Sequence, residues 1–245
     1  GAAWAFIPAY LQAKRGSHVV ITTIMFNFIA SSLMVFLLVD VIRDMKQMGP
    51  HTVALPEEIW FPTFKEFAAL FGIKIRYSPL NISFLLAIAA SFFVWFLVWK
   101  TKWGYEMRAV GHNMQAAIYA GISPYKNIII AMCISGGLAG LLGINEILGV
   151  HHKIVAGFPA GYGFTGIAVA LMGRNHPIGI FPAAFLFGIL YQGGSEVTFD
   201  MPNITRYMFV AVQGVIILFS GALENLFRPQ IESFFVNRLN MKREI

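Results

Sequence analysis

Five polar side chains stand inside long apolar runs of this sequence, and they are its first candidates for chemistry. A polar group in such a setting is costly, so it marks either a hydrogen bond between helices or a path for a polar solute. A carboxylate is the most demanding case, because it needs a partner or water. The five residues are Asn27, Asn145, Glu146, Gln192 and Gln213.

The sequence patterns of common catalytic sites are absent. The chain contains no G-x-x-x-x-G-K-[ST], no H-E-x-x-H, no C-x-x-C and no G-x-S-x-G. It therefore predicts no P-loop, no zinc site and no nucleophile elbow. His151 and His152 are adjacent, but neighbouring histidines in a loop are more often solvated than bound to metal. We expect that this polypeptide is not an enzyme and holds no metal.

The composition predicts an integral membrane protein. Hydrophobic residues make up 57% of the chain and charged residues only 12%, whereas a soluble domain carries about 25% charged residues. The formal net charge is +6, but the basic residues are dispersed among short loops. The positive-inside bias of membrane proteins accounts for that placement, so we expect no nucleic-acid partner.

Five apolar runs are long enough to cross a bilayer, which takes about 20 residues. They are 19–39, 79–99, 127–149, 178–194 and 207–223. A sixth run, 161–173, is shorter, and residues 1–8 look like the end of an earlier span, so we expect further spans upstream. The predicted fold class is all-α: a polytopic transmembrane helical bundle with a short cytoplasmic helix. The expected domains are a transmembrane domain at 1–228 and a cytoplasmic tail at 229–245.

The basic residues also predict an orientation. Loop 9–18, loop 100–126, Arg174 and the end of the chain carry an excess of them, and such loops stay in the cytoplasm. All six runs must then cross. The long loop 40–78 lies outside, where Pro56 and the acidic residues after it predict the start of a short amphipathic helix. Residues 63–71, which end at Gly72, predict a second one. These helices are either a dock for a partner or a lid over the bundle.

Two glycine-rich stretches interrupt the apolar pattern. SGGLAGLLG, at 135–143, has small residues four apart, which let helix backbones approach closely in lipid. AGFPAGYGFTG, at 156–166, is poorly compatible with one continuous helix, and non-helical backbone at membrane depth is shielded by protein or lines a cavity. Its aromatic side chains could stack on a planar ligand or simply pack. We therefore expect either a substrate path or an ordinary outer loop there.

Residues 101–124 form a polar island between two spans. Asn113 can cap the first turn of a short helix, because its side-chain oxygen can accept from open N–H groups. Gly121 suits the left-handed position after the helix, and Pro124 prevents its continuation. We expect a short capped helix on the cytoplasmic face, which either docks a soluble partner or is a structured loop without one.

The same segment carries a family resemblance. TKWGYEMRAVGHNMQAAIYAGI, at 101–122, resembles the cytoplasmic coupling segment of bacterial ABC-importer permeases that handle simple sugars, nucleosides and branched-chain amino acids. VITTIMFNFIA, at 20–30, and GFTGIAVALMGRNHPIGI, at 163–180, resemble the nucleoside-type branch, and GAAWAFIPAYLQAKRG at the start resembles a block from the middle of such permeases. Met114 departs from that branch, which usually carries proline there.

The resemblance implies a function and a set of partners. It implies the permease subunit of an ATP-driven importer in the inner membrane of a bacterium, with nucleosides as substrate and simple sugars as the alternative. Two separate ATPase subunits would bind ATP and Mg²⁺, so this chain needs no cofactor. A second permease chain, identical or different, and an extracytoplasmic substrate-binding protein would complete the assembly. A secondary transporter without an ATPase is the rival interpretation.

Two sets of residues follow as expected sites. The ATPase-coupling residues are Arg108, Gly111, Asn113, Ala116, Ala117, Ala120 and Gly121. The substrate-route residues are Asn27, Glu146, Phe158, Tyr162, Phe164 and Thr165.

Overall fold

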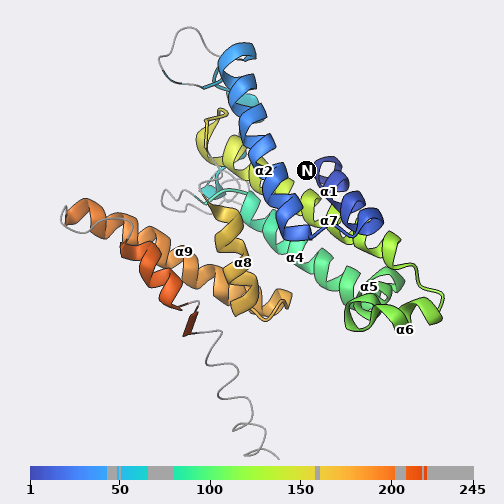
Figure 1. Ribbon diagram of the computed structural model, residues 1–245. Helices are drawn as coiled ribbons and strands as arrows, with labels where there is room; N and C mark the ends of the chain where they lie inside the picture. Colours follow the sequence, from blue (N-terminus) through green and yellow to red (C-terminus); the bar gives the residue numbers. More distant parts are fainter. Residues whose placement is uncertain are drawn as a thin grey trace, which may run out of the picture. The chain divides into compact units, whose positions relative to one another are not determined.

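The computed structural model describes residues 1–42, 49, 51–65, 80–157, 161–201, 208–216 and 218–219. The chain divides into two compact units, Gly1–Ala160 and Gly161–Ile245. Within the described residues the regular elements are helical, with only two isolated bridges, His51 with Val155 and Thr63 with Asn81. Figure 1 shows the helices of each unit.

The first unit holds most of the helices. They are α1 (Ala2–Arg15), α2 (Val19–Phe36), α4 (Ser83–Lys100), α5 (Lys102–His112), α6 (Met114–Tyr119) and α7 (Pro124–Ile144). Two of them end in π-helical turns: α2 runs into η1 (Leu37–Val41), and α7 runs into η3 (Asn145–His151). The second unit holds α8 (Tyr162–Met172) and α9 (Pro177–Asp200), and residues 208–216 are also helical.

Four helical stretches are long and apolar enough to cross a membrane. They are Val19–Val41, Ser83–Lys100, Pro124–His151 and Pro177–Asp200, and Tyr162–Met172 is a shorter apolar helix. Their large apolar side chains point outward: α2 has no buried residue at all. Such a surface is stable only against lipid or other helices. The predicted all-α polytopic bundle is therefore confirmed, while the last expected run, 207–223, is described only in part.

The glycine-rich stretch of α7 is a packing surface, as expected. Figure 1 shows α1 lying along α7, and the two helices pack on each other. A Cβ atom on Gly136 would lie 2.5 Å from the Cβ of Ala5 and 2.6 Å from the carbonyl oxygen of Gly1. A Cβ atom on Gly140 or Gly143, by contrast, would have no neighbouring atom within 4 Å. Gly136 is therefore the glycine that allows the close approach.

A helix that the sequence analysis missed folds back on the end of α4. Thr101 has an extended backbone, and its hydroxyl accepts a hydrogen bond from the N–H of Gly104 at 3.2 Å, which caps α5. A Cβ atom on Gly104 would lie 2.2 Å from the carbonyl oxygen of Leu97, so glycine is needed at this contact. On the other side of α5, Asn127 of α7 donates to Glu106 at 3.3 Å. The predicted polar loop is thus a second packed helix.

Other boundaries predicted from the sequence also differ from those of the structure. The expected loop 9–18 is wrong, because α1 continues to Arg15 and ends at Gly16, whose φ of 64° is left-handed. The helix expected after Pro56 is only the 3₁₀ turn η2 (Glu57–Ile59), and the expected helix at 63–71 lies mostly outside the described residues. The chain does break before α8, at Gly157 and Gly161 with φ of 76° and 83°. The domain at 1–228 stays a prediction, and the tail at 229–245 lies outside the described residues.

The packing of α1 on α7 predicts different effects for the same substitution at two glycines. Gly136→Ala should lower the thermal unfolding midpoint of the purified protein in detergent micelles, because overpacking costs about 1–3 kcal/mol. Gly140→Ala is the matched control on the same helix and should leave the midpoint unchanged or raise it, since alanine favours a helix by about 1 kcal/mol. Equal midpoints for the two variants would contradict the close approach at Gly136.

Candidate functional site

The short helix α6 is built as the sequence predicts. Asn113 has an extended backbone, and its side-chain oxygen accepts from the N–H of Ala116 at 3.1 Å. Gly121 has a φ of 77°, and its N–H donates to the carbonyl oxygen of Ile118 at 2.9 Å. Pro124 is the first residue of α7. The capped helix at 113–121 is therefore confirmed as local structure.

The predicted coupling residues do not all lie on one surface of α6. Ala117 is buried within its own unit, so it packs the helix onto its neighbours. The remaining six predicted residues are exposed: Arg108, Gly111, Asn113, Ala116, Ala120 and Gly121. A charge at Ala117 would thus damage the fold of this chain before it could report on a partner.

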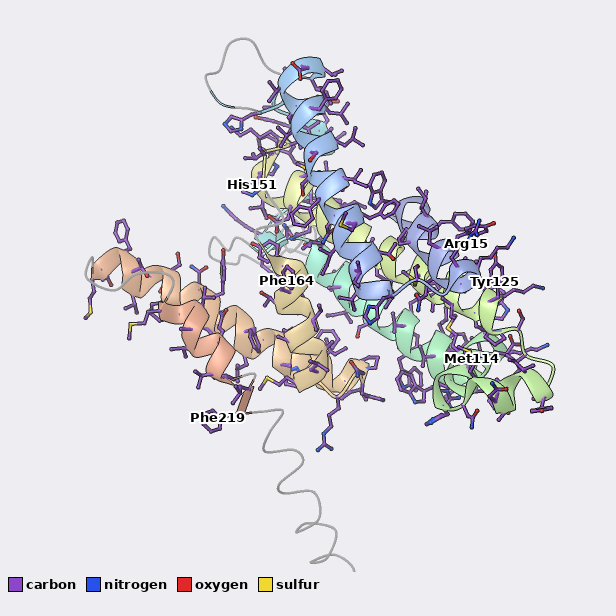
Figure 2. The ribbon with its side chains drawn as sticks, viewed as in Figure 1. Arg15, Met114, Tyr125, His151, Phe164 and Phe219 are labelled. Atoms are coloured by element: carbon purple, nitrogen blue, oxygen red, sulfur yellow. The ribbon has the colours of Figure 1, made fainter. Side chains whose placement is uncertain are left out.

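The outward surface of α6 is apolar, which the sequence analysis did not recognise. Met114, Ile118 and Tyr119 are exposed, and Tyr119 reaches 90%. Tyr119, two positions after the buried Ala117, lies on the opposite side of the helix and therefore points outward. Large apolar side chains on a helix outside the candidate spans mark an interaction surface. Figure 2 shows Met114 at one end of the first unit and His151 at the other.

A polar cluster joins the start of α4 to the end of α7. The side-chain N–H₂ of Asn81 donates to the side-chain oxygen of Asn145 at 3.4 Å and to the carbonyl oxygen of Gly149 at 3.2 Å. The hydroxyl of Ser83 lies within hydrogen-bonding reach of both amide oxygens. Asn81 is buried, so these bonds satisfy a side chain that would otherwise be costly in an apolar surrounding. The cluster holds together two helices that are far apart in the sequence.

The side chain of Glu146 contacts that of His151 within the same π-helical segment, η3. One carboxylate oxygen lies 3.5 Å from Nε2 of His151, and the other accepts from the side chain of Asn145 at 3.5 Å. His152, next in the chain, stacks on Trp60 with ring centroids 3.8 Å apart. Among the described residues no group of histidine, cysteine and acidic side chains could hold a metal ion.

A groove of about 570 Å³ lies between α4 and α7, beside the polar cluster. Its walls are mostly apolar, from residues such as Phe84, Ala87 and Leu138, and Asn81, Ser83 and Asn145 supply its polar groups. Glu146, which the sequence analysis selected, is not among the lining residues. An apolar hollow with a few convergent polar groups is the usual form of a small-molecule site.

The other predicted route residues lie apart from this cluster. Asn27 is exposed on α2 and makes no hydrogen bond within the described part of the chain. Tyr162, Phe164 and Thr165 belong to the second unit, where Tyr162 lies 6.3 Å from Tyr191 between ring centroids and Phe164 is 72% exposed. Phe158 lies outside the described residues. The role of these residues in a substrate route stays a prediction.

Comparisons with known proteins give a consistent result. The family described as "Branched-chain amino acid transport system / permease component" matches residues 1–221. The guanosine ABC transporter permease protein NupP of Bacillus subtilis is 36% identical over 89% of this chain and 61% of its own length. The nucleoside ABC transporter permease protein NupB of Lactococcus lactis is 35% identical over 86% of this chain and 58% of its own length.

A third relative, which is archaeal, is named for a different substrate. The glucose ABC transporter permease protein TsgB13 of Haloferax volcanii is 33% identical over 98% of this chain and 63% of its own length. The chain thus spans about three fifths of the length of these relatives. No solved structure matches it. With a family match across nearly all of its length and four apolar helices able to span a bilayer, the chain belongs to the branched-chain amino acid transport system permease family of multi-pass membrane proteins.

Proposed function

We propose that this chain is part of the permease subunit of an ATP-driven importer whose substrate is a nucleoside. The observation that carries the proposal is α6: a capped helix outside the spans that points Met114, Ile118 and Tyr119 away from its own unit. An apolar, aromatic surface of this kind suits the core of a protein interface. Separate ATPase subunits would occupy it, and they would bind the ATP and Mg²⁺ that this chain has no P-loop to hold.

Basic residues support a cytoplasmic position for α6. The rings of Tyr10 and Tyr125 lie 6.4 Å apart, which places the end of α1, with Lys14 and Arg15, beside the start of α7 with Lys126. Arg15 and Tyr125 are neighbours in Figure 2. The positive-inside rule puts such an end of the bundle in the cytoplasm. The end with His151 would then face outward, where a substrate-binding protein delivers its ligand.

Two lines of support favour a nucleoside over a sugar. Two of the relatives are named for guanosine or nucleosides, although a third is named for glucose. Aromatic side chains of the second unit, among them the exposed Phe164, suit the face of a planar base. A simple sugar remains the alternative, because sugars also stack on aromatic rings. A second permease chain would complete the route, since the importer architecture pairs two of them.

Tyr119 provides the test of ATPase docking. Tyr119→Ala should weaken co-purification of the ATPase about 30-fold in affinity, because a central interface tyrosine is worth about 2 kcal/mol. ATP-driven uptake should fall with it, while the unfolding midpoint stays unchanged. Phe199→Ala is the matched control, because Phe199 is 88% exposed against 90% for Tyr119. Phe199 lies at the C-terminal end of α9, whereas Arg174 comes just before the N-terminal end of that helix. ATPase binding that survives Tyr119→Ala would contradict docking on α6.

Phe164 provides the test of the substrate. Phe164→Ala should lower nucleoside uptake by the complete transporter about tenfold, because stacking on a base is worth about 1–3 kcal/mol. Phe185→Ala is the control, since Phe185 has the same 72% exposure in the same unit. The measurement is uptake of labelled nucleoside with unlabelled nucleosides, pentoses or hexoses as competitors. Competition by a free sugar and none by nucleosides would make the sugar alternative correct.

A further inference from the structure

Three exposed side chains, each four residues after the last, form a stripe along α1. The rings of Phe6 and Tyr10 lie 6.1 Å apart between centroids, and Nζ of Lys14 lies 5.1 Å from the centroid of the Tyr10 ring. Phe6 is 47% exposed and Tyr10 38%, and Lys14 is exposed as well. Residues four apart share one face of a helix. Because each residue advances a helix by 1.5 Å, this face changes from apolar to cationic over about 12 Å.

Other basic residues lie at the cationic end of this stripe. Arg15 follows Lys14 in the last turn of α1, and Lys126 lies in the first turn of α7. The rings of Tyr10 and Tyr125 meet edge to face with centroids 6.4 Å apart, which holds these two turns side by side. Arg15 and Tyr125 are labelled at this end in Figure 2. Two adjacent helical turns thus carry three exposed basic residues.

Acidic side chains are scarce at this end of the first unit. Glu106 is the single Asp or Glu within residues 1–18 and 100–127, and its carboxylate lies 4.0 Å from Nζ of Lys102. The three basic residues of the adjacent turns form no ion pair with an acidic side chain in the part of the chain that the structure describes. The end of the chain, 224–245, holds four basic and three acidic residues, so it adds no net negative charge.

We propose that this face of α1, together with Lys126 of α7, binds an anionic phospholipid. The phosphate lies against Lys14, Arg15 and Lys126. The ring of Tyr10 lies at the level of the glycerol, and an acyl chain runs along Phe6. The same order holds across a membrane leaflet, where basic and aromatic side chains settle among the headgroups and apolar ones lie below them.

The apolar end of the stripe distinguishes a lipid from a soluble acidic protein. Such a protein would meet the cations, but it would not reach Phe6, which lies about two turns deeper along α1. A phospholipid meets both ends of the stripe at once. The proposal depends on the bilayer position of this unit and not on the proposed import function.

The direct test is lipid binding by the complete permease chain in a nonionic detergent, with bound lipids counted by native mass spectrometry. Phosphatidylglycerol and phosphatidylcholine with identical chains are the two probes. The double variant Lys14→Gln, Arg15→Gln should weaken phosphatidylglycerol binding about 25-fold, equivalent to about 1 kcal/mol for each charge. Its phosphatidylcholine binding should not change. Lys14→Arg keeps the charge and should retain the wild-type affinity.

A second double variant, Lys65→Gln, Lys153→Gln, is the matched control for charge. It also removes two positive charges, but at the opposite end of the unit. Lys65 follows Phe64, whose N–H donates to Leu80 just before α4, and Lys153 follows η3. Phosphatidylglycerol should bind this variant as it binds the wild-type protein. Both double variants should keep the wild-type unfolding midpoint in detergent without lipid.

Phe6→Ala tests the contact with the acyl chain. It should weaken phosphatidylglycerol binding about threefold, since dispersion contacts with the chain are lost while detergent covers the same surface in the free protein. Phe28→Ala is the control, because Phe28 is 68% exposed on α2, and it should leave binding unchanged. Glycerol 3-phosphate has the phosphate without the chains and should not displace the lipid.

Several results would overturn the inference. Equal affinity of the wild-type protein for the two lipids would do so, as would an equal loss of binding in the two double variants. Displacement by glycerol 3-phosphate, or wild-type binding by Phe6→Ala, would leave a site for soluble anions and no lipid site. Intact lipid binding with lost ATPase co-purification in Lys14→Gln, Arg15→Gln would assign the basic residues to the ATPase. The lipid measurements use neither substrate nor ATP, so a failed uptake test would contradict only the proposed function.

Discussion

The structure depends on one constraint: inside a bilayer, the backbone has no water with which to form hydrogen bonds. Every N–H and C=O at membrane depth must be satisfied within the protein. The long apolar stretches accordingly form uninterrupted helices, and the breaks occur where another acceptor is at hand. Gly16 ends α1 by donating back to Gln12. The π-helical turns η1 and η3 prolong two spans without leaving them open.

Lipid also removes the usual driving force for helices to associate, since hydrocarbon surrounds them whether or not they touch. Close backbone contact and dispersion then decide which helices pair. Gly136 lets α1 approach α7, and Gly104 lets α5 fold against the end of α4. Both glycines stand where a methyl group would collide with backbone or with a neighbouring side chain. Large side chains such as Phe28 on α2 remain free to meet lipid or further helices.

The two ends of the first unit are chemically distinct, as the proposed function requires. One end carries basic residues and the apolar surface of α6, which suits a soluble protein at a membrane face. The other end gathers amides, a carboxylate and histidines around a groove between α4 and α7. The helices α4 and α7 connect these ends. After the turn at 120–123, α7 follows α6 in the chain and leads into η3, which carries Asn145 of the polar cluster.

The sequence alone determined four of the five long apolar helices, the class of fold and the capped helix α6. Those features depend on local quantities: the length of an apolar run, the capping oxygen of Asn113 and the left-handed freedom of Gly121. The small residues around Gly136 were recognisable for the same reason, although the sequence did not distinguish Gly136 from Gly140.

Only the tertiary structure decided which residues meet. Asn81 and Asn145 are 64 positions apart, and no local pattern relates them. The direction of α6 was undetermined until its neighbours showed that Ala117 is inside and Tyr119 outside. Glu146 and His151 are close in the sequence, yet an α-helix would hold them apart, so their pairing required the π-helical turn. Helical periodicity is set locally only while the helix stays regular, and at η3 the contacts with Asn81 and the outer segment accompany its departure from that regularity.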